Sequence, residues 1–284
     1  MMIGVGASRA VIDGAGKFAV ADFSVPQFNF VRTIFAVAVL LPTLLRGQGL
    51  RALHTSNPLA HGLRAALQAV IVSIWYLGLR HLELADATAI SMGSPIIVTV
   101  MSALVLKEHI GPRRWAAVAV GFCGMLLIIR PGTSLFDPWA LLPLGVSFCY
   151  SAFLISSRAL RHGESVAALT LYPQFGILIS SGIGAVFAWQ PLTQAGLWAM
   201  AIGGVMGAVS HLGMTLAPRW APASVLAPMD YVPLVWAIIL GFVMFGDLPD
   251  AYTVTGAALI VGAGIFIAYR ESKVGNLQRS IDAA

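Results

Sequence analysis

The chain has 284 residues, of which 58% are hydrophobic and only 10% are charged. Soluble domains carry about 25% charged residues, so this composition excludes an ordinary soluble protein and indicates a polytopic membrane protein. The net charge of +5 would suit a nucleic-acid partner, but the basic residues lie between apolar segments and form no recognisable binding module. We therefore expect the lipid bilayer, and no nucleic acid, as a partner.

Ten apolar segments are predicted to cross the membrane as helices, each close to the ~20 residues that a bilayer requires. The segments are 1–20, 27–45, 58–80, 84–106, 114–130, 138–160, 167–189, 194–217, 221–245 and 251–270. The first is the most unusual, because Arg9, Asp13 and Lys17 lie four residues apart on one helical face. These three side chains either neutralise one another or contact a substrate.

The basic residues predict the orientation of the bundle. With both termini in the cytoplasm, 12 of the 17 Lys and Arg residues lie on the inner side and 4 on the outer side, with Arg9 inside the first helix. This bias fits the positive-inside rule and indicates a multi-pass protein of a cell inner membrane. A homodimer is left open as an alternative to a monomer.

The second half of the chain repeats features of the first. Pro95 corresponds to Pro233 at a spacing of 138 residues, and Glu108 to Asp247 at a spacing of 139. Five spans in each half make the second half inverted relative to the first, and inverted repeats are typical of transporters with a site near the midplane. The predicted units are a first repeat at 1–132, a second repeat at 133–272 and a cytoplasmic tail at 273–284.

Asp230 is the leading candidate for function, because a carboxylate in an apolar span is costly and should face a cavity or a partner. His211 lies on the preceding helix at a similar predicted depth. The two could bind a substrate amine or cycle a proton, since a histidine titrates near neutral pH. A hydrogen-bonded pair that only fixes helix packing is the structural alternative.

Further candidates lie near the middle of the predicted helices. Aromatic side chains can stack a flat or cationic solute, or simply pack. Arg32 is expected near the outer surface, where its long side chain could reach the interface. The remaining candidate binding residues are Trp75, Tyr76, Tyr231, Gln68, Asp13 and Lys17.

Signatures of enzymes and cofactors are missing from the sequence. The segment Gly14 to Lys17 lacks the leading glycine and the final Ser or Thr of a phosphate-binding loop. The six histidines form no metal-binding helix motif, and Cys123 and Cys149 lie in apolar spans, where we expect buried, unreactive thiols. We therefore expect no metal, no cofactor and no ATP-driven pump.

Short motifs along nearly the whole chain resemble the EamA-type transporters of the drug/metabolite transporter superfamily. The first-half motifs are Asp13 to Lys17, Phe30 to Arg32, Leu63-Arg64, Ala85 to Pro95, Lys107-Glu108, Pro112 to Trp115 and Arg130 to Gly132. Those of the second half are His211, Ala221 to Ala223, Pro228 to Tyr231, Phe245 to Asp250 and Gly256 to Gly264. The sequence departs from the family in its short first helix and in Asp230 and Asp247, where Glu is more frequent.

This resemblance implies two interlocked five-helix repeats around a central cavity that opens alternately to each side. The branch that it most resembles includes S-adenosylmethionine uptake proteins, and carriers of riboflavin and amino acids belong to the same superfamily. We expect a secondary transporter of a small organic metabolite. The alternative is an intramembrane enzyme that acts on a lipid-linked substrate, with Asp230 and His211 as acid and base.

Overall fold

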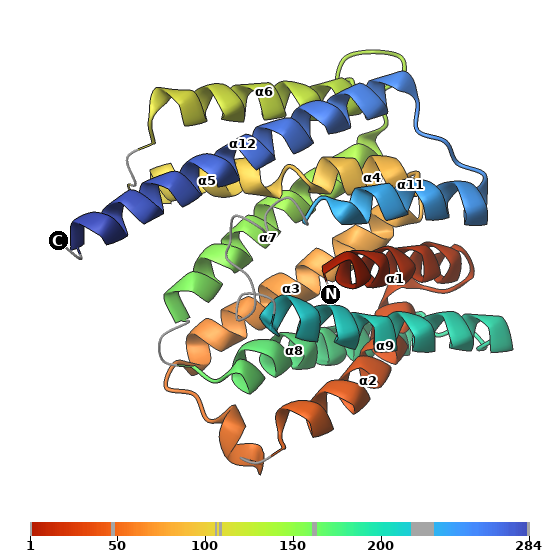
Figure 1. The fold of residues 1–284 in the computed structure, drawn as a ribbon. Coiled ribbons are helices and arrows are strands. Elements are labelled where there is room, and N and C mark those ends of the chain that lie inside the picture. Colours follow the sequence, from red (N-terminus) through yellow and green to blue (C-terminus); the bar gives the residue numbers. More distant parts are fainter. Residues whose placement is uncertain are drawn as a thin grey trace.

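The computed structural model describes residues 2–46, 49–105, 107, 110–160, 164–216 and 230–282. Every regular element in these ranges is a helix, and the long helices form a single bundle (Figure 1). The elements are α1 (Met2–Asp22), α2 (Val25–Leu44), η1 (Gly49–Leu53), α3 (Pro58–Leu79), α4 (Leu84–Ser91), α5 (Ser94–Val105), α6 (Pro112–Ile129), η2 (Pro138–Ala140), α7 (Leu141–Leu160), α8 (Val166–Phe187), α9 (Gln194–Leu216), α11 (Val232–Phe245) and α12 (Ala251–Asp282).

Eight stretches of the described chain are long and apolar enough to cross a membrane, with α4 and α5 counted together as one. Helix α1 has the length but carries four charged residues, and α11 is a shorter apolar helix of 14 residues. An all-α polytopic protein with about ten spanning helices is therefore confirmed. The division at residue 132 stays a prediction.

One expected helix is interrupted, and another is described only from Asp230 onward. The segment predicted as one helix at 84–106 breaks at Met92 and Gly93, between α4 and α5. Of the segment predicted at 221–245, residues 221–229 lie outside the described residues; Asp230 and Tyr231 form a turn, and α11 begins directly after it. Each of these two turns is followed by a proline, which lacks an N–H group and is best placed in the first turn of a helix. The two turns are 138 residues apart, the same spacing as the prolines.

The last helix is longer than its apolar sequence predicts. Helix α12 continues from Ala251 to Asp282 and so runs through most of the segment expected to be a cytoplasmic tail. Its first turn is anchored by Asp250, whose carboxylate accepts a hydrogen bond from the Thr253 backbone N–H at 2.8 Å. The preceding helix, α11, ends at Gly246, whose φ of 75° suits glycine better than other residues.

Glycines allow a close helix contact between α6 and α12. A Cβ atom on Gly124 would lie 2.7 Å from the Gly256 carbonyl oxygen, and one on Gly256 would lie 2.6 Å from the Gly124 oxygen. Small residues at such a crossing are typical of membrane helices. Large apolar side chains such as Phe187 and Val243 are exposed on the outer surface, where lipid would cover them.

Candidate functional site

Helix α1 brings the chain's most unusual charges into the bundle. It packs along α9 and α11, with which it lies side by side in Figure 1. Asp13 accepts a hydrogen bond from the indole nitrogen of Trp75 at 2.8 Å, and Lys17 forms an ion pair with Asp247 at 2.6 Å. Asp13 and Lys17 thus each have a partner outside α1, whereas neutralising each other along α1 would require no such partner. Of the two, only Asp13 lies in the middle of its helix.

A group of charged and aromatic side chains surrounds Asp13. The charge of Arg9 acts on Asp13, His211 and Asp230, and that of Arg32 acts on Asp13 and His211. The same two arginines act on Tyr76, and Arg9 also acts on Tyr150. We call these residues the polar cluster: Arg9, Asp13, Arg32, Trp75, Tyr76, Tyr150, His211 and Asp230.

The members of the polar cluster differ in exposure. Arg9, Asp13, Trp75, Tyr150 and His211 are half-buried, and burial desolvates Asp13, Tyr150 and His211. A desolvated side chain that is still reachable from solvent is suited to bind a polar ligand, because water competes weakly and the ligand can still enter. The polar cluster also combines positively and negatively charged side chains with the flat faces of aromatic rings.

Asp230 and His211 both lie within reach of the charge of Arg9. Asp230 is exposed in the turn before α11, while His211 is half-buried in α9. His211 also lies within reach of the charge of Arg32. The direct pairing of Asp230 and His211 stays a prediction.

Three other predicted site residues are buried. Tyr76 is 2% exposed, and its ring contacts the Phe28 ring edge to face, at 4.6 Å between centroids. Tyr231 is 8% exposed and its hydroxyl lies against Gly264, where no Cβ would fit. Gln68 is 8% exposed in the middle of α3. These burials favour packing roles for all three.

Arg32 is the residue whose placement was predicted wrongly. It is 6% exposed in the interior of the bundle rather than reaching the membrane surface. Asn29, one turn earlier on the same helix, and Thr33, the next residue, are both fully buried. Three polar residues at i, i+3 and i+4 share one helical face, so this spacing could have revealed an inward-facing polar stripe. Arg9 and Tyr150 were also missed as members of the polar cluster.

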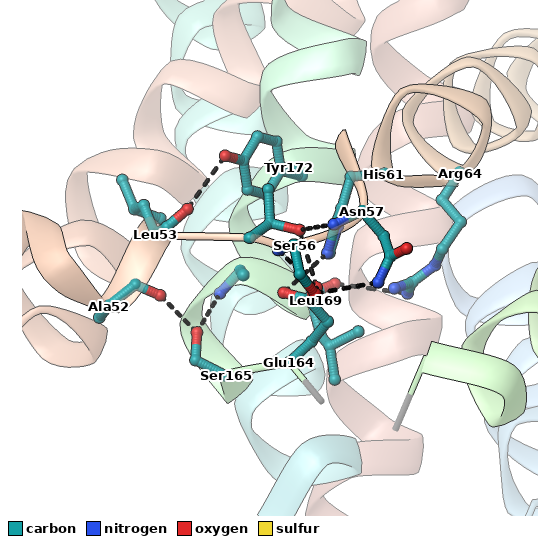
Figure 2. A network of polar contacts seen from close by, with 12 residues as sticks. Ala52, Leu53, Ser56, Asn57, His61, Arg64, Glu164, Ser165, Leu169 and Tyr172 are labelled. Atoms are coloured by element: carbon teal, nitrogen blue, oxygen red, sulfur yellow. Dashed lines mark hydrogen bonds and ion pairs between the residues drawn. The ribbon is translucent and has the colours of Figure 1, made fainter. Parts of the chain in front are cut away.

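A second polar network closes one end of the bundle, which we call the Glu164 end (Figure 2). Glu164 accepts hydrogen bonds from the Thr55 hydroxyl at 2.8 Å and from the Ser56 N–H at 3.3 Å, and its carboxylate lies 3.3 Å from His61 Nε2. Burial alone would raise the pKa of Glu164, but these contacts hold that pKa below its ordinary value. The tie joins the two predicted halves, since Thr55 precedes α3 and Glu164 precedes α8.

Ion pairs close the opposite end, which we call the Asp247 end. Lys17 pairs with Asp247, and Arg130 pairs with Asp250 while lying over the Tyr252 ring at 4.5 Å. A polar cavity of about 300 Å³ opens beside the second pair. It is lined by His81, Leu82, Glu83, Asp86, Ile90, Ile128, Ile129, Arg130, Leu135, Asp137, Ala140, Leu248 and Asp250.

A second cavity, of about 250 Å³, lies between α4, α11 and α12 and is apolar. Thr253 is its one polar lining residue among those that the structure describes.

The two cysteines were expected to be buried thiols. Both are free, but Cys123 is exposed on α6. Within the described ranges, no group of three His, Cys, Asp or Glu side chains could hold a metal ion.

The chain is similar to transporters over most of its length. The EamA-like transporter family matches residues 1–130. A riboflavin transporter of Vibrio cholerae is 29% identical over 285 residues, covering 99% of this chain and 95% of that protein. A riboflavin transporter of Rhizobium johnstonii is 32% identical over 240 residues, covering 84% of this chain and 79% of that protein. An S-adenosylmethionine uptake transporter of Rickettsia prowazekii is 29% identical over 247 residues, covering 87% and 84%.

One solved crystal structure shares the fold, with a TM-score of 0.61 at 18% identity. The match covers 93% of this chain and 96% of that one. The likeness in fold thus extends over both predicted halves, beyond the residues that the family itself matches. The family match over residues 1–130 and the 32% identity to the Rhizobium johnstonii protein across most of the sequence show that the chain belongs to the EamA-like transporter family.

Proposed function

We propose that this protein is a secondary transporter that carries a small organic metabolite across a cell inner membrane by alternating access. The named solutes of its relatives, riboflavin and S-adenosylmethionine, define the class of candidates, with amino-acid-like solutes beside them. The observation that carries the proposal is the polar cluster, in which the hydrogen-bonded Asp13 and Trp75 lie with Arg9 in the interior of the bundle. Such groups inside a membrane protein mark solute or ion pathways.

The contacts at the two ends support alternating access. Glu164 joins the predicted halves at one end, and Lys17 with Asp247 joins them at the other. Breaking one tie while keeping the other would open the polar cluster to one side only. This arrangement needs no ATP and no second copy of the chain. Coupling to protons would act through the carboxyl and imidazole groups of the polar cluster.

Uptake into proteoliposomes tests the proposal. We expect wild-type protein to take up at least one of labelled S-adenosylmethionine, riboflavin or a set of amino acids. Replacing Asp13 by Asn should slow that uptake about tenfold or more, because a charged hydrogen bond is worth about 1.5–3 kcal/mol. Asp22→Asn is the matched control, since it changes the same residue type at the exposed end of the same helix. Equal uptake by both variants would contradict the assignment of the site.

A pH gradient distinguishes the mode of coupling. Accumulation that depends on the gradient and is lost in Asp230→Asn would support proton coupling. Accumulation that ignores the gradient would indicate an exchanger or a facilitator instead. The intramembrane enzyme is the remaining alternative, and it predicts turnover of a lipid-linked substrate without any solute flux.

The proposed orientation places both termini and the Glu164 end in the cytoplasm. The excess of Lys and Arg at that end supports it. In a variant without Cys123 and Cys149, we expect a cysteine in place of Asp137 to react with an impermeant maleimide added to whole cells. A cysteine in place of Ser56 should react only after the membrane is opened. The reverse pattern would overturn the orientation.

A further inference from the structure

Helix α2 presents three buried polar side chains that its neighbours do not satisfy. Asn29 and Thr33 are 0% exposed and Arg32 is 6% exposed. Both side-chain atoms of the Asn29 amide, the Thr33 hydroxyl and the Nε and Nη2 atoms of Arg32 have no hydrogen-bond partner within the described part of the protein. An unsatisfied buried polar group costs about 1–3 kcal/mol, so a whole stripe of them calls for a role.

Other buried polar side chains in the same bundle are satisfied to different degrees. Gln27, on the same helix, donates to the Gln190 carbonyl at 2.7 Å and accepts from the Gln190 N–H at 2.9 Å. Arg64, another deeply buried arginine, donates to the Leu169 carbonyl at 3.4 Å and lies over the Phe153 ring, although its Nε and Nη1 atoms have no partner among the described residues. The α2 stripe differs in that three side chains on one helical face carry unpaired buried atoms.

Aromatic rings contact the Arg32 guanidinium, but none of the ion pairs among the described residues includes it. Its guanidinium lies over the rings of Phe28 and Tyr76, at 5.8 and 5.4 Å from their centroids. The ion pairs among the described residues join Lys17 with Asp247, His61 with Glu164 and Arg130 with Asp250, and Arg32 belongs to none of them. Aromatic faces attract a cation but do not cancel its charge.

Space beside Arg32 is provided by glycines of α9. A Cβ on Gly203 would lie 3.6 Å from the Arg32 Cδ, and one on Gly207 would lie 3.6 Å from its Nη1. His211 follows one turn later and senses the Arg32 charge, as does Asp13. The guanidinium therefore borders the polar cluster, and on its α9 side these two glycines leave a space about the size of a methyl group.

We propose that Arg32, assisted by Asn29 and Thr33, binds an oxyanion of the transported solute, a carboxylate or a phosphate. The planar guanidinium matches such a group through two parallel hydrogen bonds, and the amide and hydroxyl supply further donors. The carboxylates of Asp13 and Asp230 would meet a positive group of the same solute. This inference rests on the proposed function and narrows its solute class to anions and zwitterions that contain a flat ring.

The two solutes named for the relatives differ in this respect. S-adenosylmethionine carries a carboxylate and positive groups, whereas riboflavin carries no ionised group at neutral pH. Decarboxylated S-adenosylmethionine lacks only the carboxylate, and flavin mononucleotide adds only a phosphate to riboflavin. These two matched pairs separate the oxyanion from the rest of the solute and also separate its two sources.

The test measures binding and uptake with both pairs. Binding is measured as the change in Tm of the purified protein in detergent with each of the four compounds and with inorganic phosphate. Uptake is measured in proteoliposomes. We expect the member that carries the oxyanion, in at least one pair, to bind about ten- to a hundredfold more tightly than the member without it. Arg32→Gln should bring that ratio close to one, and Arg32→Lys should keep part of it.

Arg64→Gln is the control, because it removes an arginine of similar burial that has its own partner; it should leave the ratio unchanged. Arg32→Met adds a readout that a packing role would not produce: the Tm of the protein without solute should rise, since an uncompensated buried charge is removed.

The outcomes separate this inference from the proposed function. Arg32-dependent binding of anions without any uptake would support the inference and contradict transport. Uptake with equal affinity within each pair, or a ratio that survives in Arg32→Gln, would overturn the inference and leave transport standing. The inference would also be overturned if the Tm of the wild-type protein responded to none of the compounds that carry an oxyanion, which are S-adenosylmethionine, flavin mononucleotide and inorganic phosphate.

Discussion

The two ends of the bundle are closed by different chemistry. At the Asp247 end, Lys17 and Asp247 form an ion pair whose side chains are 16% and 23% exposed. At the Glu164 end, the side chains of His61 and Glu164 are 0% and 1% exposed, and hydroxyl and backbone donors complete the contact. Water and salt therefore reach the first tie and hardly reach the second. A carrier built this way would have one end sensitive to ionic strength and one end sensitive to loss of hydrogen bonds.

The largest expected effect comes from breaking the buried tie. Glu164→Ala leaves the Thr55 hydroxyl and the buried His61 ring without their acceptor, which should lower the free energy of unfolding by about 2 kcal/mol. Because the site is buried, the loss should be the same at low and high salt. Thermal unfolding in detergent at both salt concentrations measures it.

Glu164→Gln serves as the control for that experiment. Its amide oxygen can still accept from Thr55 and from the Ser56 N–H, so a smaller loss is expected than in Glu164→Ala. Equal losses in the two variants would show that packing, and not the hydrogen bonds, closes the Glu164 end.

A smaller effect is expected at the exposed end. A double-mutant cycle with Lys17→Met and Asp247→Asn should give a coupling energy of about 1 kcal/mol or less at low salt. Screening should reduce it towards zero at 1 M salt, where the Debye length is about 3 Å. A coupling energy that ignores salt would mean that the two ends do not differ in the way their exposure indicates. The swapped pair Lys17→Asp with Asp247→Lys controls for loss of the individual side chains.

The same contrast explains which features could be read from the sequence. The membrane spans could be predicted from unbroken apolar runs, because each apolar residue makes the insertion of a helix into lipid more favourable. The turns at Met92 and at Asp230 were indicated only indirectly, by Pro95 and Pro233. Sequence spacing cannot say whether a proline kinks a helix or starts a new one, as Pro173 shows by lying inside the continuous helix α8.

Partners across the bundle were beyond sequence reasoning. The spacing of Arg9, Asp13 and Lys17 correctly placed them on one face, but 230 residues separate Lys17 from Asp247, and only the fold brings them together. Trp75 was named for its ring, while its indole N–H turned out to hold Asp13. The polar face of α2 was visible in the spacing of Asn29, Arg32 and Thr33, but the contact of that face with the glycines of α9 is known only from the fold.

The smallest expected effect lies within the Asp247 end and has opposite signs at two carboxyls. Burial and the neighbouring carboxylates of Asp86 and Asp247 raise the pKa of Glu83. Burial would also raise the pKa of Asp250, but the Thr253 N–H and Arg130 hold that pKa below its ordinary value. Ionised Glu83 therefore costs stability at pH 7, while ionised Asp250 contributes it.

Substitution at pH 7 should accordingly stabilise at one position and destabilise at the other. Glu83→Gln should raise the free energy of unfolding by no more than about 0.5 kcal/mol, as is typical of an exposed side chain, and Asp250→Asn should lower it. The contribution of Glu83 is favourable below its ordinary pKa of about 4.3 and is lost as the pH rises through its raised folded-state pKa. That of Asp250 is present above about pH 3.9 and is lost as the pH falls through its depressed folded-state pKa. Unfolding curves of both variants between pH 3 and 8 measure the two trends, and parallel pH profiles would show that Arg130 does not distinguish the two carboxyls.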